Sequence, residues 1–340
     1  MRAIIYRETG DSNVMRLVEK PEPKPAPGEV LVRIAVSGVN PTDWKARRGD
    51  KSGDRLTFPE VVPNQDGAGT IIGVGEGVDP SRTGQRVWIW EAAYKRANGT
   101  AQEVVALPEP QAVPLPNMAS WDLGASLGIP ALTAHRCLTV HERTGAGLGP
   151  GSLSGMKVLV VGGAGAVGHA AIQLAHWSGA EVITTVSSPE KEFLATMAGA
   201  HHVVNYRKQD FVDAIRLVAP KGVDIIVDVA PHANQELSQA IAAQNAVIAI
   251  YASDASAMSI PIRPSMTSNL RYQFVMVYTV PPEAKKMAVA DVQRALIGGA
   301  LKVGKEAGLP LLHFSLEQTA AAHAAVEGSA LGKVLININR

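Results

Sequence analysis

The sequence contains a single cysteine, Cys137, among its 340 residues. One thiol excludes an intramolecular disulfide and a zinc site built from several cysteines, and it is typical of a reducing compartment. The ordinary role of such a residue is that of a small buried hydrophobic side chain. The N-terminal stretch MRAIIYRETG lacks an apolar core of secretory length. No uncharged run approaches the ~20 residues that span a bilayer, so we expect a cytoplasmic protein that does not bind a membrane.

An excess of charge is also missing. Lys and Arg number 32 and Asp and Glu number 31, so the formal net charge is +1. This balance provides no field that would steer the protein toward nucleic acid or an anionic membrane. A basic stripe with exposed aromatic residues, the usual mark of a nucleic-acid surface, is absent too. The expected partner is therefore a small molecule.

The length of the chain and the change in its residue pattern along the sequence predict two domains. Residues 1–126 are rich in proline and glycine and contain short runs of β-forming residues. Short strands broken by turn signals indicate a partly open β-barrel. The clearest of these runs are EVLVRIAV (29–36), GTIIGVG (69–75) and QRVWIW (85–90).

From about Trp121 the pattern changes to apolar strands that alternate with helical segments. This alternation predicts βαβ units on a parallel sheet over residues 127–268. Residues 269–340 lose the βαβ rhythm. We expect a long helix from Pro282 to Ala307, a second helix over 315–329 and a closing strand, and we expect this tail to return to the first domain.

The strongest local motif is VLVVGGAGAVGHAAIQLA, residues 158–175. Gly163, Gly165 and Gly168 satisfy G-x-G-x-x-G directly after a strand and at the start of a helix. In this motif the first glycine permits the tight turn, the second lets backbone N–H groups approach a pyrophosphate, and the third allows the helix to pack on its strand. The N-terminus of the helix adds partial positive charge. The motif therefore predicts a dinucleotide site.

The end of the next strand indicates which dinucleotide binds. An NAD site usually presents Asp or Glu there to the ribose hydroxyls, whereas this strand runs into Ser187, Ser188, Pro189, Glu190 and Lys191. Two hydroxyls and an ammonium suit a 2′-phosphate, which Lys191 can pair with. Ser188 and Pro189 also form an ordinary helix start, and both roles are compatible. The sequence favours NADPH.

Several longer stretches together resemble the medium-chain dehydrogenase/reductase superfamily, and within it the zinc-independent quinone oxidoreductases of the zeta-crystallin group. The resemblance covers nearly the whole chain and implies an α/β fold in which a Rossmann doubly wound parallel sheet is inserted into a GroES-like β-barrel catalytic domain. It is carried by GEVLVRIAVSGVNPTDWKARRGD, PEVVPNQDGAGTIIGVGEGV, GQRVW, GASLGIPALTAHRCL, GMKVLVVGGAGAVGHAAIQLA and GAHHVVNYRKQDF.

The resemblance also locates the positions that hold zinc in alcohol dehydrogenases. Asn40 and Ile129 stand where those enzymes have cysteines, and Gln65 stands where they have a histidine. None of these three side chains is a usual zinc ligand, and the four-cysteine structural lobe is missing. We therefore expect no metal.

By the same resemblance, the dinucleotide site would be shared among several segments. Asn40 would face the nicotinamide end, and Tyr251 would narrow that end because relatives usually have glycine there. Asn64 replaces another usual glycine, and the sequence does not explain it. The implied cofactor residues are Asn40 and Thr133, then Gly163, Ala164, Gly165, Ala166 and Val167 at the pyrophosphate, Ser187, Lys191 and Tyr206 at the 2′-phosphate, and Tyr251, Met276, Val277 and Tyr278 beside the nicotinamide.

The acceptor would bind at a mouth formed by Asn40, Lys51, Trp90, Tyr94 and Tyr278, and no residue stands out as a proton donor. The resemblance implies an NADPH-dependent quinone oxidoreductase that acts on quinones or conjugated carbonyls, and by analogy with relatives a homodimer. One alternative is a reductase of enals, enones or enoyl thioesters. Such an enzyme would use basic residues at the cleft mouth, and the candidates are Arg47, Arg48, Lys51 and Arg55. The other alternative is a non-catalytic NADPH-binding protein of the crystallin or RNA-binding kind.

Overall fold

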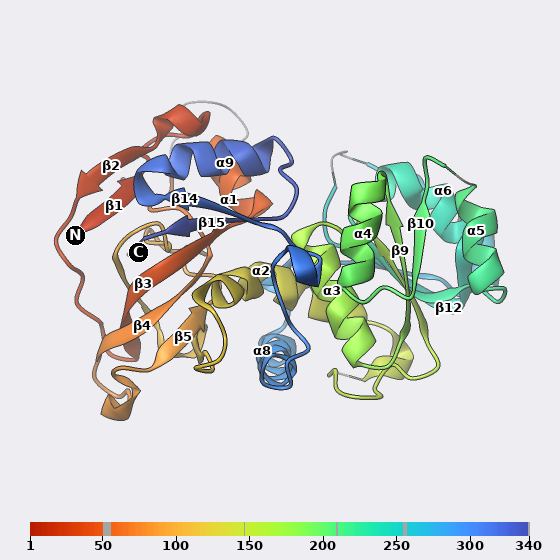
Figure 1. Ribbon diagram of the computed structural model, residues 1–340, viewed down its shortest axis with the longest axis horizontal. Helices are drawn as coiled ribbons and strands as arrows, with labels where there is room; N and C mark the ends of the chain where they lie inside the picture. The colour runs from red at the N-terminus through yellow and green to blue at the C-terminus, as the bar shows by residue number, and fades with distance from the viewer. Residues whose placement is uncertain (50–55, 146, 209, 254–256, 339–340) are drawn as a thin grey trace. The chain divides into compact units, whose positions relative to one another are not determined.

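The computed structural model describes residues 1–49, 56–145, 147–208, 210–253 and 257–338. The chain forms two compact units. One unit contains Met1–Ile129 together with Leu311–Arg340, and the other contains Pro130–Pro310. The first unit therefore comes from both ends of the chain, with the second inserted between them, as the sequence predicts (Figure 1).

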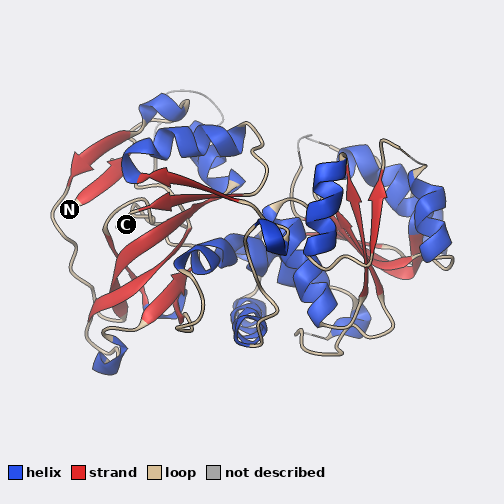
Figure 2. Cartoon of the chain, in the orientation of Figure 1, coloured by secondary structure: helices blue, strands red, loops and turns tan. Residues whose placement is uncertain are grey.

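A seven-stranded sheet is the main element of the first unit (Figure 2). The strand order is β14-β15-β3-β4-β5-β7, and β6 also pairs with β3. Strand β15, near the end of the chain, pairs antiparallel with β3 and parallel with β14, so it lies inside the sheet. The strands are β3 (Glu29–Val39), β4 (Asp66–Val74), β5 (Arg86–Ile89), β6 (Val104–Pro108), β7 (Ala112–Pro114), β14 (Leu311–Ser315) and β15 (Lys333–Asn337).

Apolar residues of these strands form the core of the first unit, with buried side chains such as Val32, Ile34 and Ile336. Each fully buried side chain of this size contributes roughly 1.5–3 kcal/mol. The remaining elements cover this core. They are β1 (Arg2–Ile5) paired with β2 (Arg16–Glu19), α1 (Pro41–Arg48), α9 (Thr319–Glu327), the first half of α2 (Trp121–Leu138), and the 3₁₀ turns η1 (Ser12–Val14), η2 (Pro80–Arg82), η3 (Glu109–Gln111) and η7 (Leu316–Gln318).

The second unit contains a six-stranded sheet in the order β10-β9-β8-β11-β12-β13. All neighbouring strands run parallel, and this is the strand order of a Rossmann fold. The strands are near-continuous apolar runs because helices cover both faces of such a sheet. They are β8 (Lys157–Val161), β9 (Glu181–Val186), β10 (His202–Asn205), β11 (Val223–Asp228), β12 (Ala242–Ile250) and β13 (Arg271–Phe274).

The helices of the second unit follow the predicted alternation. They are the second half of α2, α3 (Ala166–Trp177), α4 (Pro189–Met197), α5 (Phe211–Val218), α6 (Pro231–Ile241), α7 (Ile262–Thr267) and α8 (Pro282–Ile297), with 3₁₀ turns η4 (Glu142–Thr144), η5 (Val277–Thr279) and η6 (Lys305–Ala307). Among the described residues, none of the helices combines the length and the apolar character that crossing a bilayer requires.

The tail of the chain differs from the expectation in two ways. Helix α8 ends at Ile297 and not at Ala307, because Gly298 and Gly299 follow, and Gly299 has the left-handed φ of 70° that ends helices. The return to the first unit occurs at Leu311 and not at residue 269. Strand β13 extends the parallel sheet beside β12, and α8 is held within the second unit through its buried Asp291, which bonds to His135 and to the backbone N–H of Leu148.

Candidate functional site

The turn between β8 and α3 leaves no room for a Cβ at Gly163 and Gly168, but it does at Gly165. A Cβ on Gly163 would lie 2.2 Å from Oγ1 of Thr184, and a Cβ on Gly168 would lie 2.4 Å from the carbonyl oxygen of Gly162. A Cβ on Gly165 would meet only the oxygen of Gly162, at 3.5 Å. The tight turn itself is made by Gly162, with φ of 73°, so Gly163 serves packing rather than the turn.

The first turn of α3 is free of side-chain caps. Its N-cap residue is Gly165, which has no side chain that could cap the helix. The N-terminal N–H groups of a helix lack partners within the helix, so they bind phosphate when no side chain caps them. A turn that excludes side chains at Gly163 and Gly168 and leaves these N–H groups accessible fits a dinucleotide pyrophosphate.

The end of β9 forms the helix start that the sequence predicts and brings Ser187 and Lys191 together. Oγ of Ser188 accepts a hydrogen bond from the backbone N–H of Lys191 at 3.3 Å, so Ser188 is the N-cap of α4. The ammonium of Lys191 lies 3.2 Å from Oγ of Ser187 and donates to it. The backbone N–H of Tyr206 donates to the carbonyl of Val186 at 3.2 Å, which brings the exposed Tyr206 beside them. A hydroxyl and an ammonium therefore lie together at the end of β9, and the chain segment that carries Tyr206 follows the neighbouring strand β10.

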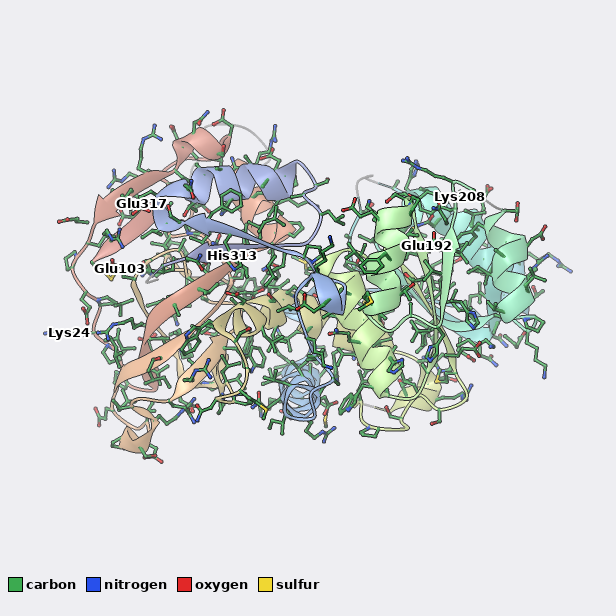
Figure 3. The ribbon with its side chains drawn as sticks, in the orientation of Figure 1. Lys24, Glu103, Glu192, Lys208, His313 and Glu317 are labelled. Carbon is green, nitrogen blue, oxygen red and sulfur yellow. The ribbon has the colours of Figure 1, made fainter. Side chains whose placement is uncertain are left out.

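The candidate residues of the second unit follow different strands of one parallel sheet. Gly162 follows β8, Ser187 follows β9, Tyr206 follows β10, Tyr251 follows β12 and Met276 follows β13. Because all six strands are parallel, their carboxyl ends share one edge of the sheet, where dinucleotides bind in open α/β folds. In Figure 3, Lys208 marks the segment after β10 at this edge.

Tyr251 is held at this edge through the backbone of Asp228. Its N–H donates to the carbonyl of Asp228 at 3.2 Å, and burial, together with the nearby Cys137 and Asp228, raises the pKa of the phenol. Burial also raises the pKa of the Asp228 carboxyl, one oxygen of which accepts from Ala230 and Asn234. The Cys137 thiol is fully buried and its pKa is raised to about 12, which fits the hydrophobic role.

The other predicted residues of this unit have different environments. Thr133 on α2 and Val277 on η5 are buried, whereas Met276 is exposed. Tyr278 is half-buried. Of these, Met276 and Tyr278 present side-chain surface to solvent, so they are the better candidates for contact with a ligand.

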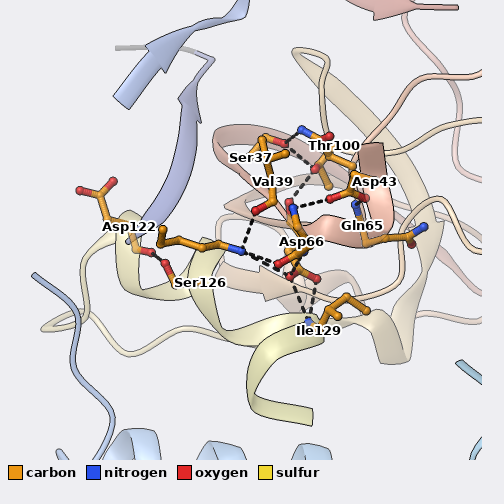
Figure 4. Close-up of polar contacts among 12 residues, drawn as sticks. Ser37, Val39, Asp43, Gln65, Asp66, Thr100, Asp122, Ser126 and Ile129 are labelled. Atoms are coloured by element: carbon orange, nitrogen blue, oxygen red, sulfur yellow. Dashed lines mark hydrogen bonds and ion pairs between the residues drawn. The ribbon is translucent and has the colours of Figure 1, made fainter. Parts of the chain in front are cut away.

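In the first unit, four polar side chains form a buried cluster around Asp66 (Figure 4). Nδ2 of Asn40 donates to Oδ2 of Asp66 at 2.6 Å, and the ammonium of Lys333 donates to Oδ1 of Asn40 at 2.7 Å. The carboxylate of Asp66 also accepts from the backbone N–H of Ile129, at 3.0 Å to each oxygen. Asp43 accepts from the backbone N–H groups of Asn40 and Gln65, at 2.7 and 3.1 Å.

Burial dominates the electrostatics of this cluster. Burial and then the neighbouring charge of Asp66 raise the pKa of Asp43 to about 8. Burial raises the pKa of Asp66 to about 6, less far because the Lys333 ammonium and the Asn40 amide favour its ionised form. Burial lowers the pKa of Lys333 while both carboxylates oppose the shift. Charge neutrality in a medium of low dielectric is best met when Asp43 holds a proton and ionised Asp66 is balanced by the Lys333 ammonium.

The three positions that correspond to zinc ligands do not fit a metal. Both ends of the Asn40 amide are hydrogen-bonded within the protein, Oε1 of Gln65 accepts from the N–H of Ala93, and Ile129 contributes only its backbone. Within the described ranges no three His, Cys, Asp or Glu side chains are grouped so as to hold a metal ion. These three positions are therefore unsuited to binding zinc.

Gln65 instead supports the loop that carries Trp90 and Tyr94. Its carbonyl accepts from Ala92 at 3.0 Å and its side chain accepts from Ala93 at 3.1 Å. Glu91 and Lys95 in this loop have φ of 52° and 56°. Left-handed backbone at non-glycine residues persists only where surrounding contacts impose it.

The other predicted mouth residues are not brought together by the described part of the chain. Lys51 and Arg55 are outside the described residues, and Tyr278 belongs to the second unit. Arg47 is fully buried and forms an ion pair with Glu327 at 2.7 Å, and Arg48 pairs with the same carboxylate. Arg47 and Arg48 therefore hold α1 to α9, and they are not part of a cationic mouth.

The structure explains Asn64. Its φ is 79°, a conformation that glycine adopts freely and that asparagine tolerates. Its amide donates to Oγ of Ser37 at 2.9 Å and accepts from Nε2 of His323 at 2.8 Å. Asn64 therefore keeps the turn of a glycine and adds a buried link to α9.

The sequence reasoning missed Asp43, Asp66 and Lys333. The signal for Asp43 is its place three residues after Asn40, where its side chain caps the N-terminus of α1. Asp66 adjoins Gln65 in the motif PNQDGAG, and a carboxylate within an apolar, glycine-rich strand predicts a buried partner. Lys333 has no local signal beyond a charge at the start of an apolar strand.

The fold and the glycine turn are those of a dinucleotide-binding protein, and comparison with known proteins identifies its family. Residues 26–117 match the family described as alcohol dehydrogenase GroES-like domain, and residues 166–294 match the family described as zinc-binding dehydrogenase. The quinone oxidoreductase of Rattus norvegicus is 35% identical over 240 residues, which cover 70% of this chain and 68% of the rat protein.

Two solved structures match over the whole chain. A mycobacterial protein complexed with NADPH has a TM-score of 0.81 at 27% identity, over 99% of this chain and all of the other. An NAD-dependent alcohol dehydrogenase has a TM-score of 0.83 at 27% identity, over all of both chains. The chain belongs to the medium-chain dehydrogenase/reductase superfamily. It is an NAD(P)-dependent oxidoreductase, and both the family and the fold that the sequence predicts are confirmed.

Protonation of His323 is expected to control acid stability. Burial lowers the pKa of His323 from 6.5 to about 3, so its neutral form stabilises the fold above pH 6.5 and this contribution is lost as the pH falls toward 3. His323→Gln keeps a donor for Asn64. Between pH 7 and pH 5 the wild type should lose about 2 kcal/mol more unfolding free energy than the variant, as measured by urea unfolding.

The control is His232→Gln, which replaces an exposed histidine and should leave the pH dependence as in the wild type. Equal pH slopes for the wild type and His323→Gln would contradict the assignment.

Proposed function

We propose that the protein is an NADPH-dependent quinone oxidoreductase that transfers hydride to quinones or conjugated carbonyl compounds without zinc. Two features of the structure support the proposal: the glycine turn after β8 and the hydrogen bonds made at the three positions that correspond to zinc ligands. The turn at Gly162–Gly168 is shaped for a pyrophosphate, and Asn40, Gln65 and Ile129 use their polar groups inside the protein. The relatives named quinone oxidoreductase support the same reaction.

The chemistry at the end of β9 favours NADPH over NADH. Lys191 and Ser187 would bind the 2′-phosphate through charge-assisted hydrogen bonds, and Tyr206 would border it. Glu190 lies in the first turn of α4 and is exposed, where a carboxylate interacts favourably with the helix dipole. The first turn of α3, with Ala164 to Val167, would hold the pyrophosphate. When bound, the reduced nicotinamide supplies the hydride.

The protein's own contribution at the reacting end is positioning. Tyr251, Met276 and Tyr278 follow the carboxyl ends of β12 and β13 and are proposed to flank the nicotinamide. Trp90 and Tyr94 are proposed to contact the acceptor. Quinones and enones accept hydride at carbon while negative charge spreads onto oxygen, so weak hydrogen-bond donors and solvent suffice. Oxidation of a simple alcohol relies on a Lewis acid, for which this chain offers no ligand set among its described residues.

Replacement of Lys191 tests the cofactor preference. Lys191→Ala should weaken NADPH binding about ten- to a hundredfold and leave NADH binding nearly unchanged, because a charge-assisted phosphate contact is lost. Dissociation constants come from fluorescence titration of each cofactor. Lys221→Ala is the matched control, since Lys221 precedes β11 at the opposite edge of the sheet. Equal losses for NADPH and NADH would show that Lys191 serves only the helix.

Isotope transfer tests the reaction. With NADPH deuterated at C4, deuterium should appear in a reduced enone, and with a quinone the acceptor and NADPH should be consumed one for one. Both activities should survive a zinc chelator, and ethanol should not be oxidised. Chelator-sensitive ethanol oxidation would refute the proposal. Activity with enoyl thioesters alone would favour a double-bond reductase, and the lack of NADPH oxidation with every acceptor would favour a binding protein.

We also propose a homodimer formed through β13. This strand ends the strand order of the described sheet, and the exposed side chains near it include Phe274, Met276, Ile262 and Met266. An exposed edge strand with apolar side chains favours pairing with a second copy. Sedimentation velocity should find a dimer in the wild type and a monomer for Phe274→Lys. Phe193→Lys, at an exposed phenylalanine on α4, should leave the dimer intact, and a monomeric wild type would contradict the proposal.

A further inference from the structure

Lys333 is a lysine with no access to solvent. Its side chain is 1% exposed, and its ammonium donates to Oδ1 of Asn40 at 2.7 Å and to the carbonyl of Val39 at 3.3 Å. The third neighbour is Oδ2 of Asp66 at 4.0 Å. Lysine is almost never fully buried unless its charge is paired, so this arrangement calls for a specific role.

The carboxylates of the cluster need a cation. Asp66 is 0% exposed and Asp43 is 4% exposed, and two buried carboxyl groups side by side cannot both ionise without a compensating charge. Backbone N–H groups of Asn40, Gln65 and Ile129 supply hydrogen bonds to them but no net charge. The Lys333 ammonium lies 4.0 Å from Oδ2 of Asp66, and its charge lowers the pKa of both carboxyl groups against the effect of burial.

The backbone packs closely against the charged side chains of the cluster. A Cβ on Gly128 would lie 2.0 Å from Oδ1 of Asp66, and a Cβ on Gly38 would lie 2.1 Å from the carbonyl oxygen of Ala125 and 3.2 Å from Cε of Lys333. The backbone of α2 and β3 therefore packs directly against both charged side chains. The Lys333 ammonium supplies the positive charge here without the water shell that a free cation would bring.

The amide of Asn40 lies between the two charges. An ammonium has only donors and a carboxylate only acceptors, so Oδ1 must face Lys333 and Nδ2 must face Asp66. The opposite orientation would place Nδ2 against an ammonium and Oδ1 against a carboxylate. Lys333 and Asp66 therefore fix one orientation of the amide.

We propose that Lys333 is the resident cation of this cluster and a positioning residue for Asn40: its ammonium neutralises Asp66 and holds the Asn40 amide in one orientation. The positive charge that a carboxylate site in another protein obtains from a metal ion is here part of the chain. This role is independent of the cofactor and the acceptor, so it stands or falls separately from the proposed reaction.

A double-mutant cycle of Lys333→Met and Asp66→Asn in the full chain tests the proposal by thermal unfolding. Lys333→Met keeps most of the side-chain length and removes the charge. It should lower Tm by about 5 to 12 °C, because an uncompensated carboxylate is left buried. Adding Asp66→Asn should restore at least half of this loss. Lys24→Met is the control, since Lys24 projects into solvent (Figure 3), and it should leave Tm unchanged.

Two NMR measurements keep the test decisive if Lys333→Met does not fold. In wild type labelled with ¹⁵N-lysine, Lys333 should give a charged, slowly exchanging ammonium signal at pH 7. In the folded double variant, the Asn40 side-chain amide should exchange with solvent about tenfold faster than in the wild type. A neutral amine at Lys333, additive effects in the cycle, or an unchanged Asn40 amide would each overturn the proposal.

Discussion

The burial of the Asp66 carboxylate is the constraint on which the first unit depends. A charge without access to water costs several kcal/mol unless hydrogen bonds and an opposite charge compensate it. At Asp66 these come from three separate segments: the amide of Asn40 between β3 and α1, the N–H of Ile129 in α2, and the ammonium of Lys333 in β15. The C-terminal strand must therefore lie beside β3. The return of the chain to its first unit is an electrostatic requirement as well as a matter of packing.

In the second unit, the proposed phosphate site depends on the absence of side chains at the glycine turn. Around Gly163 and Gly168 the protein's own atoms fill the space that a Cβ would need, and no side chain caps the N-terminus of α3. A ligand with charged phosphates is held by backbone and helix dipole, so this site requires little of its side chains. Side chains enter the proposed site at Ser187 and Lys191, and the preference for NADPH is proposed to arise there.

The glycine turn could be predicted from the sequence, whereas the buried cluster around Asp66 could not. The glycine turn and the Ser188 cap depend on residues within a few positions of one another, so their spacing alone predicts them. Lys333 and Asn40 are separated by 293 positions, and no local pattern connects a lysine in one strand with an asparagine at the start of a distant helix. The unusual φ of Asn64 is likewise imposed by contacts to Ser37 and His323. The predicted extension of α8 to Ala307 failed because two consecutive glycines outweighed the helical pattern around them.

The name of the family that matches residues 166–294 does not imply a metal in this chain. That match lies within the second unit, whereas the positions that correspond to zinc ligands, Asn40, Gln65 and Ile129, lie in the first. Each of them is engaged in hydrogen bonds that a metal ion would have to break. In the first unit these side chains therefore stabilise the buried carboxylates and are unsuited to binding an ion. A site organised in this way can orient groups but cannot polarise an unreactive carbonyl as a Lewis acid does, which is why the acceptors proposed above are compounds that are already electron-poor.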